Sequence, residues 1–216
     1  MKKALLFFVL ISAPLMLAQA QYARFGAKAG GGFASTYGAD GSSDYTNPLG
    51  VYHIGGIVSY EFVSRIAVQA ELLYAQKGFT YEDFIYAPGE DLSGDLRLHY
   101  LELPLLFKLQ KGGLFAEAGP YIGYLLSASD DFRLSTAGTN PDVEPPSFYD
   151  SDHLQRFDYG YTVGLGIMLD NGFFMSIRNT GGFRSFSKDL DQKNLDFRVS
   201  IGYLIPPPNA VEIMRR

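Results

Sequence analysis

The sequence contains no cysteine, no tryptophan and three histidines, His53, His99 and His153. Without cysteine there is no disulfide, no thiolate metal site and no cysteine for lipoprotein attachment. Acid–base catalysis needs a base within hydrogen-bond reach of a nucleophile or water, and no Gly-x-Ser-x-Gly motif is present. We therefore expect no enzyme activity, with a site at the outer rim near His99 or His153 as the alternative.

After residue 20 the chain also lacks a long apolar run and an excess of basic residues. No stretch there is long and apolar enough for a transmembrane helix. The 18 Lys and Arg residues stand against 23 Asp and Glu residues, so the chain offers no basic patch to nucleic acid. Glycine and aromatic residues are plentiful, with 24 Gly, 15 Tyr and 17 Phe. Aromatic side chains form the interfacial girdles of membrane barrels, and glycine lets crowded strands curve.

The first twenty residues have the layout of a secretion signal. Lys2 and Lys3 precede an apolar run from Ala4 to Leu17, and Ala18-Gln19-Ala20 is a small-x-small cleavage site. We expect residues 1–20 to be a signal peptide for export. An N-terminal membrane anchor is the alternative, although the run is short for a spanning helix.

Eight strand-like segments follow, and the connections between them alternate in length. The long connections are 37–50, 81–95 and 129–154, the short ones are 63–65, 110–113 and 170–172, and 187–193 is intermediate. Outer-membrane barrels have tight turns at the periplasm and longer loops outside. Over residues 21–205 the sequence therefore predicts an all-β, eight-stranded antiparallel up-and-down transmembrane β-barrel, a right-handed meander with long outer loops and short periplasmic turns. The even strand number places both termini in the periplasm.

In five of these segments one face is free of charge. Aliphatic and aromatic side chains occupy alternate positions of residues 52–62, 66–74, 101–107, 159–167 and 195–203. The other face carries the charges, such as Glu71 and Lys77 in one segment. Alternate residues of a barrel strand face lipid, where a Lys or Arg at the midplane costs about 2–4 kcal/mol. We expect the uncharged face to contact the outer-membrane lipid.

The short turns predict which side chains lie opposite one another. Three-residue turns at 63–65 and 170–172 pair Ser59 with Gln69 and Gly164 with Arg178. The glycine would leave space for the guanidinium group.

A two-residue turn at Lys111-Gly112 pairs Lys108 with Phe115 and makes Glu117 the diagonal neighbour of Lys108. The same register places Pro104 opposite Gly119. Proline donates no hydrogen bond to a central ladder, so we expect a bulge or kink there.

Several motifs resemble the PorT-like outer-membrane β-barrel family of Bacteroidota, a porin family. Tyr100–Lys108 (YLELPLLFK) is similar to a characteristic strand of that family, and so are Glu71–Gly78 (ELLYAQKG), Ala118–Tyr124 (AGPYIGY) and Gly164-Leu165-Gly166 with Arg178. The resemblance covers most of the mature chain. It implies a barrel that takes part in secretion or uptake across the outer membrane.

The interior of an eight-stranded barrel is wide enough only for side chains. Acids and bases both fall on the inward face, and the turn at 170–172 adds a pairing of Asp158 with Arg184. Because an unpaired buried charge costs roughly 3–5 kcal/mol, we expect nearly complete pairing. The expected network consists of Lys28, Glu71, Glu102, Lys108, Glu117, Asp158, Arg178 and Arg184. A polar plug is the main interpretation, and a proton or ion path is the alternative.

Two of the long loops are acidic, and we expect them to be solvated rather than to hold a cofactor or metal. Divalent-ion binding is the alternative because calcium prefers oxygen ligands, but no EF-hand pattern is present. The acidic residues are Glu82, Asp83, Glu90, Asp91 and Asp95, and Asp130, Asp131, Asp142, Glu144, Asp150 and Asp152.

The C-terminus departs from a simple barrel. Pro206, Pro207 and Pro208 block strand continuation and begin a periplasmic tail over residues 206–216. The tail is either disordered or a docking peptide for an envelope protein complex, which could also bind the outer loops. We expect a non-catalytic structural or accessory component of an envelope assembly, with a narrow porin or small-solute channel as the alternative.

Overall fold

The computed structural model describes residues 22–38, 46–63, 65–87, 90–136 and 153–206. The expected signal peptide and all of the expected tail beyond Pro206 lie outside these residues. No helix long and apolar enough to cross a membrane occurs in the described part of the chain.

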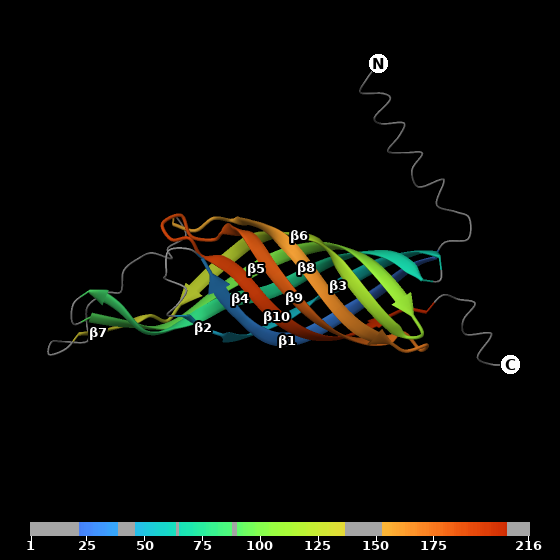
Figure 1. The fold of residues 1–216 in the computed structure, drawn as a ribbon, viewed down its shortest axis with the longest axis horizontal. Coiled ribbons are helices and arrows are strands. Elements are labelled where there is room, and N and C mark those ends of the chain that lie inside the picture. Colours follow the sequence, from blue (N-terminus) through green and yellow to red (C-terminus); the bar gives the residue numbers. More distant parts are fainter. Residues whose placement is uncertain (1–21, 39–45, 64, 88–89, 137–152, 207–216) are drawn as a thin grey trace, which may run out of the picture.

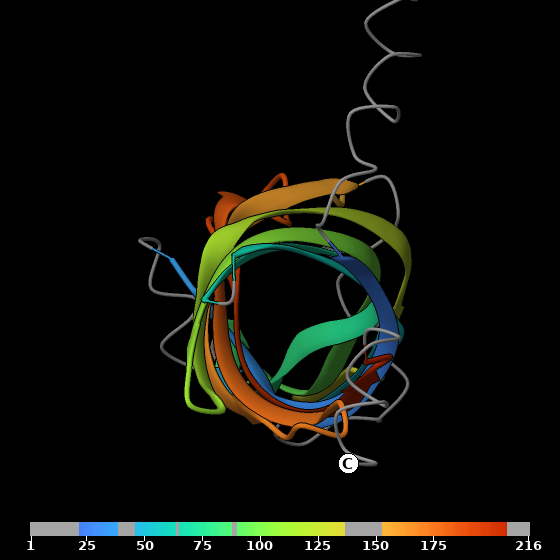
Figure 2. The same ribbon diagram turned by 90° about the vertical axis from the view of Figure 1, so that its right-hand side faces the viewer.

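Eight long antiparallel strands form a closed ring, which confirms the predicted fold class (Figures 1 and 2). Each strand pairs with its neighbours along the chain, and the last strand pairs with the first. The ring consists of β1 (Tyr22–Tyr37), β3 (Leu49–Val63), β4 (Ile66–Ala87), β5 (Glu90–Lys111), β6 (Leu114–Asp130), β8 (Phe157–Met168), β9 (Phe173–Ser185) and β10 (Lys193–Leu204). Two short strands, β2 (Thr46–Asn47) and β7 (Arg133–Thr136), lie outside the ring.

The seam between β1 and β10 depends on glycine. A Cβ atom at Gly30 would lie 2.0 Å from the carbonyl oxygen of Val199 and 2.7 Å from Cε1 of His53. A Cβ at Gly32 would lie 2.0 Å from the carbonyl oxygen of Phe197. The Gly30-Gly31-Gly32 run thus allows the close backbone approach that closes the ring.

The turn between β5 and β6 differs from the prediction by one residue. Lys111 pairs with Leu114 around Gly112 and Gly113, whose φ angles are +58° and +83°. A two-residue hairpin turn with positive φ at both central positions strongly favours glycine, so lysine does not occupy it.

This shift corrects three expectations for β5 and β6. Lys108 pairs directly with Glu117, whereas Pro104 lies opposite Tyr121 rather than Gly119. The expected bulge at Pro104 is also wrong, because the register shift in this pair lies between His99 and Tyr100. The predicted pairs Ser59 with Gln69 and Gly164 with Arg178 are confirmed.

The connection expected at residues 81–95 is mostly strand. β4 and β5 extend beyond the ring as a hairpin, visible at the left of Figure 1. β2 pairs with β4, and β7 pairs with the beginning of β5. The alternation continues here, since Phe79 and Tyr81 are buried while Thr80 and Glu82 are more accessible. The sequence predicted a loop here because residues 81–95 contain five acidic residues.

The outward face of the ring is an apolar band. No Lys, Arg, Asp or Glu occupies an outward position in residues 23–37, 50–62, 66–76, 99–109, 114–126, 157–169, 173–183 or 195–205. Many large apolar side chains on this face are exposed, and they include Phe25, Tyr52, Leu72, Phe107, Ile122, Tyr159, Leu165, Ile177, Phe197 and Ile201. The band forms a continuous surface suited to hydrocarbon.

Replacing Leu72 with lysine tests this face. Leu72 lies in the apolar outward row of β4 and is 53% exposed. We expect Leu72→Lys to lower the free energy of unfolding in lipid vesicles by about 2–4 kcal/mol, because the ammonium group would enter hydrocarbon. Urea titration of the reconstituted barrel measures the change, with Leu72→Met as control. Equal stability of the two variants would contradict the membrane assignment of this row.

Candidate functional site

Within the described residues, ten buried charged side chains of the barrel interior form two clusters of ion pairs. The turn-side cluster lies nearer the short turns and consists of Lys28, Glu71, Lys108, Glu117 and Arg178. The loop-side cluster consists of Lys77, Glu102, Asp158, Asp196 and Arg198. Each of these residues is between 1% and 4% exposed.

Arg178 on β9 is the centre of the turn-side cluster. Its Nη1 and Nη2 atoms each donate to a different oxygen of Glu71 at 2.7 Å, and its Nε donates to Glu117. Lys28 Nζ lies 2.6 Å from Glu71 Oε2. Gly164, opposite Arg178 on β8, leaves room for the side chain, because a Cβ there would lie 2.8 Å from Arg178 Cγ. The bidentate geometry makes Arg178 a fixed bridge between β4 and β6.

Lys108 completes the turn-side cluster from β5. Its Nζ lies 4.0 Å from Glu117 Oε2 and donates to Gln69 Oε1 at 3.2 Å. The same ammonium group lies 3.8 Å from the centre of the Phe115 ring. Lys108 therefore combines an ion pair, a hydrogen bond and a cation–π contact.

Two cations organise the loop-side cluster. Lys77 Nζ lies 2.8 Å from Glu102 Oε1 and 3.3 Å from Asp158 Oδ2. Arg198 Nη1 donates to Glu102 Oε2 at 2.7 Å, and its Nη2 donates to Asp196 Oδ2 at 2.9 Å. Neutral groups support the carboxylates, since the Tyr121 hydroxyl and the Asn194 amide both donate to Asp158 Oδ2 at 2.9 Å.

The two clusters balance each other electrically. The turn-side cluster has three cations and two carboxylates, whereas the loop-side cluster has two cations and three carboxylates. Their opposite excesses cancel, so the ten side chains carry no formal net charge. This balance matters because a buried charge without a partner is strongly destabilising.

Apolar side chains close the interior on both sides of the charges. On the turn side, Ile57, Phe115, Met168, Phe174 and Leu204 form one buried cluster. On the loop side, a larger cluster contains Phe79, Tyr81, Leu96, Leu98, Tyr100, Leu125, Phe132, Leu154 and Phe186. The ten charges therefore lie between two clusters of buried apolar side chains.

The structure separates the predicted network into these two clusters. All the predicted residues except Arg184 belong to one or the other, but Glu102 and Asp158 lie with the loop-side cations. No ion pair joins the two clusters in the part of the chain that the structure describes. The loop-side cluster also contains Lys77, Asp196 and Arg198, which the alternation of their strands places inward but which the predicted network did not include.

Arg184 corrects the prediction. It is exposed, and the expected alternation of β9 breaks before it. Between β9 and β10 the register shifts, so that Lys193 pairs with Ser185 while Leu195 pairs with Gly181. The extra residues on β9 form an irregularity that carries Arg184 away from Asp158 and out of the interior.

The three histidines lie apart. His53 Nε2 is 2.8 Å from Ser200 Oγ, but both residues are buried in the interior, with 2% and 0% exposure. His99 faces outward and contacts the Tyr74 hydroxyl at 2.7 Å, while His153 contacts Asp189 at 2.6 Å. The buried His53–Ser200 contact has no access for a substrate.

The acidic positions do not form a metal site within the described residues. No group of three or more His, Asp or Glu side chains there has a metal-binding arrangement. Asp95 instead accepts hydrogen bonds from Thr80 at 2.7 Å and Arg97 at 2.8 Å. The expected positions Asp142, Glu144, Asp150 and Asp152 lie outside the described residues, so the divalent-ion alternative stays a prediction.

A family comparison identifies the chain. Residues 17–188 match the model described as outer membrane protein beta-barrel domain. The protein belongs to this family. This outer-membrane barrel therefore contacts membrane lipid with its apolar band, and the family is typically non-catalytic. No curated protein sequence matches the chain.

Several solved structures are similar to this outer-membrane barrel. Ail of Yersinia pestis is 13% identical, with 85% of this chain and 99% of that chain covered and a TM-score of 0.45. Neisserial surface protein A is 8% identical, with 83% and 96% covered and a TM-score of 0.48. CarO2 of Acinetobacter baumannii is 10% identical, with 82% and 98% covered and a TM-score of 0.39. These identities are too low to transfer a function.

Arg178 and Arg184 form a matched pair for testing the interior. Arg178→Met leaves Glu71 and Glu117 buried with fewer partners, and we expect it to lower the free energy of unfolding by roughly 3–5 kcal/mol. Arg184→Met removes an exposed guanidinium on the same strand, and we expect a change within about 0.5 kcal/mol. Urea unfolding of both variants in the same detergent provides the comparison. Similar losses in both variants would show that the buried pairs do not determine stability.

Proposed function

We propose that this outer-membrane barrel is a non-conducting, non-catalytic component of an envelope assembly. The observation that carries the proposal is the filled interior, with ten mutually paired charges between two apolar layers. Arg178 binds Glu71 and Glu117 from two other strands, and Arg198 binds Glu102 from β5 and Asp196 from its own strand, so movement of either group would break several charge-assisted hydrogen bonds. Such an interior supports a rigid membrane anchor better than a passage for solutes.

A narrow water or ion path is the second candidate. It is favoured by buried polar atoms that have no hydrogen-bond partner among the described residues, including Glu117 Oε2, Asp158 Oδ1 and Ser176 Oγ. Atoms of this kind are suitable positions for ordered water. The mainly apolar layers at both ends oppose a continuous path, because they offer few polar contacts to an ion.

Conductance of the reconstituted barrel distinguishes the two candidates. We expect the full mature chain in a planar lipid bilayer to show no stable open level, with a known open porin as positive control. Phe115→Ala and Phe174→Ala remove rings from the turn-side layer and are expected to leave the current at baseline, because the charge clusters remain. A stable, large open pore in the unmodified protein would reject the proposal and favour the channel.

The partner would bind outside the apolar band. The β4–β5 hairpin extends beyond the ring and pairs with β2 and β7. The second candidate contact is the tail that begins at Pro206, where proline residues would hold a docking peptide away from the barrel. The resemblance to the PorT-like family supports an assembly for secretion or uptake, with both termini in the periplasm.

Deletion of residues 209–216 tests the tail. The deletion leaves Pro206–Pro208 and every described residue in place, so the barrel is expected to fold and to keep its stability. Affinity purification from native outer membranes is expected to recover an envelope protein with the full chain and to lose it with the deleted chain. The same co-purifying proteins at the same yield would exclude the tail as the docking segment.

A further inference from the structure

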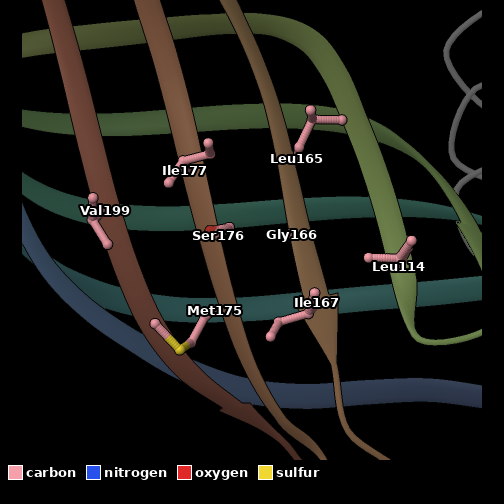
Figure 3. Close-up of a pocket in the computed structure, with 8 residues that line it drawn as sticks. All are labelled: Leu114, Leu165, Gly166, Ile167, Met175, Ser176, Ile177 and Val199. Atoms are coloured by element: carbon pink, nitrogen blue, oxygen red, sulfur yellow. The ribbon is translucent and has the colours of Figure 1, made fainter.

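Two adjacent grooves lie on the lipid-facing wall at the turn side of the barrel. The first is lined by Leu114, Leu165, Ile167, Met175, Ile177 and Val199 around Gly166 and Ser176 (Figure 3). The second is lined by Arg65, Leu109, Gln110, Lys111, Phe115 and Ala116, and shares Leu114, Leu165 and Gly166 with the first. The shared residues make the two grooves continuous.

The walls of the first groove are aliphatic. Figure 3 shows its side chains on four strands, β6, β8, β9 and β10. Leu114 lines both grooves and is 64% exposed, so it projects from the wall where the two grooves meet. Both grooves lie beside the apolar band, which places hydrocarbon chains rather than water against them.

Two cations lie where the second groove reaches the short turns. The backbone N–H of Gln110 donates to the carbonyl oxygen of Arg65 at 2.8 Å, which brings Arg65 and Lys111 to the same edge. Both side chains are exposed, and neither has an ion-pair partner among the described residues. By contrast, Arg24 at this end is paired with Glu61 at 2.8 Å. The acidic residue of the neighbouring turn, Asp170, lines neither groove.

We propose that these grooves bind one phospholipid, with an acyl chain on each side of Leu114 and its phosphate held by Arg65 and Lys111. A guanidinium group binds phosphate oxygens through paired hydrogen bonds, and a nearby ammonium group adds a point charge. The unpaired positive charge complements the phosphate, and the aliphatic walls complement the chains. The lipid would come from the leaflet beside the short turns.

Native mass spectrometry of the full mature chain in detergent, titrated with dioleoylphosphatidylglycerol, tests the proposal. Arg65→Gln with Lys111→Gln is expected to weaken lipid binding about tenfold, because two charge-assisted contacts to the phosphate are lost. The control is Arg156→Gln with Arg184→Gln, which removes two exposed arginines at the opposite end of β8 and β9 and is expected to bind like the unmodified protein.

A second pair of variants tests the groove itself. Ala116→Trp fills the second groove without touching its cations, whereas Ala118→Trp places the same ring at the next outward position of β6, outside both grooves. We expect Ala116→Trp to lose lipid and Ala118→Trp to retain it. Gel mobility of the folded and heat-unfolded forms verifies that each variant folds. If Ala116→Trp does not fold, the comparison of Arg65→Gln with Lys111→Gln against its arginine control tests the proposal.

Two further ligands test whether the acyl chains or the phosphate alone account for binding. Dioleoylglycerol carries the chains without phosphate, and inorganic phosphate carries the anion without chains. We expect neither to displace the phospholipid at equal concentration. Unchanged lipid binding by Arg65→Gln with Lys111→Gln, equal binding by the two tryptophan variants, or full displacement by inorganic phosphate would overturn the proposal.

Discussion

Hydrocarbon cannot hydrogen-bond, and this constraint determines most of the structure. Every backbone group within the membrane must find a partner in the protein, which for strands requires a ring without an edge. The glycines of β1 allow that closure, because a side chain at Gly30 or Gly32 would collide with the backbone of β10. Once the wall is closed, ionisable groups can lie only inside, and the barrel is too narrow to hold bulk water around them. The charges must therefore solvate one another.

Because the buried charges must solvate one another, the formal charges of the two clusters cancel. Each cluster alone carries an excess of one charge, and the other cluster balances it. The turn-side excess of one cation and the loop-side excess of one carboxylate lie in consecutive layers of the same low-dielectric interior, where opposite charges attract over longer distances than in water. Replacing such clusters with apolar residues can preserve or raise stability in other proteins, so stability alone does not explain them. Here they also link strands across the lumen, because Arg178 binds Glu71 and Arg198 binds Glu102 on strands that are not their neighbours.

The sequence predicted the features of the fold that depend on alternation and turn length. The predicted strand pairing was wrong where an irregularity changes the register. Strand number, outward faces and the pairs at Ser59 and Gly164 follow from period-two patterns. The predicted β5–β6 register was wrong by one turn residue, because both central positions of the turn have positive φ, which Gly112-Gly113 adopts more readily than Lys111-Gly112. Arg184 was misplaced by the irregularity in β9, which leaves no pattern in the local sequence. The division into two clusters depends on which residues of non-neighbouring strands lie at the same level of the lumen. The residue pattern within one strand does not predict that alignment.

The β4–β5 hairpin indicates where the membrane ends. Along β4 the same alternate residues face outward throughout, but the polarity of the outward and inward rows changes. In β4 the outward row is apolar from Ile66 to Tyr74 and polar at Thr80 and Glu82. The inward row carries Glu71 and Lys77 but then Phe79 and Tyr81. Between the two regimes lies Gly78, with a φ of +140° and no room for a Cβ against the carbonyl oxygen of Leu96. Beyond this level water surrounds the hairpin, so its interior is an ordinary apolar core.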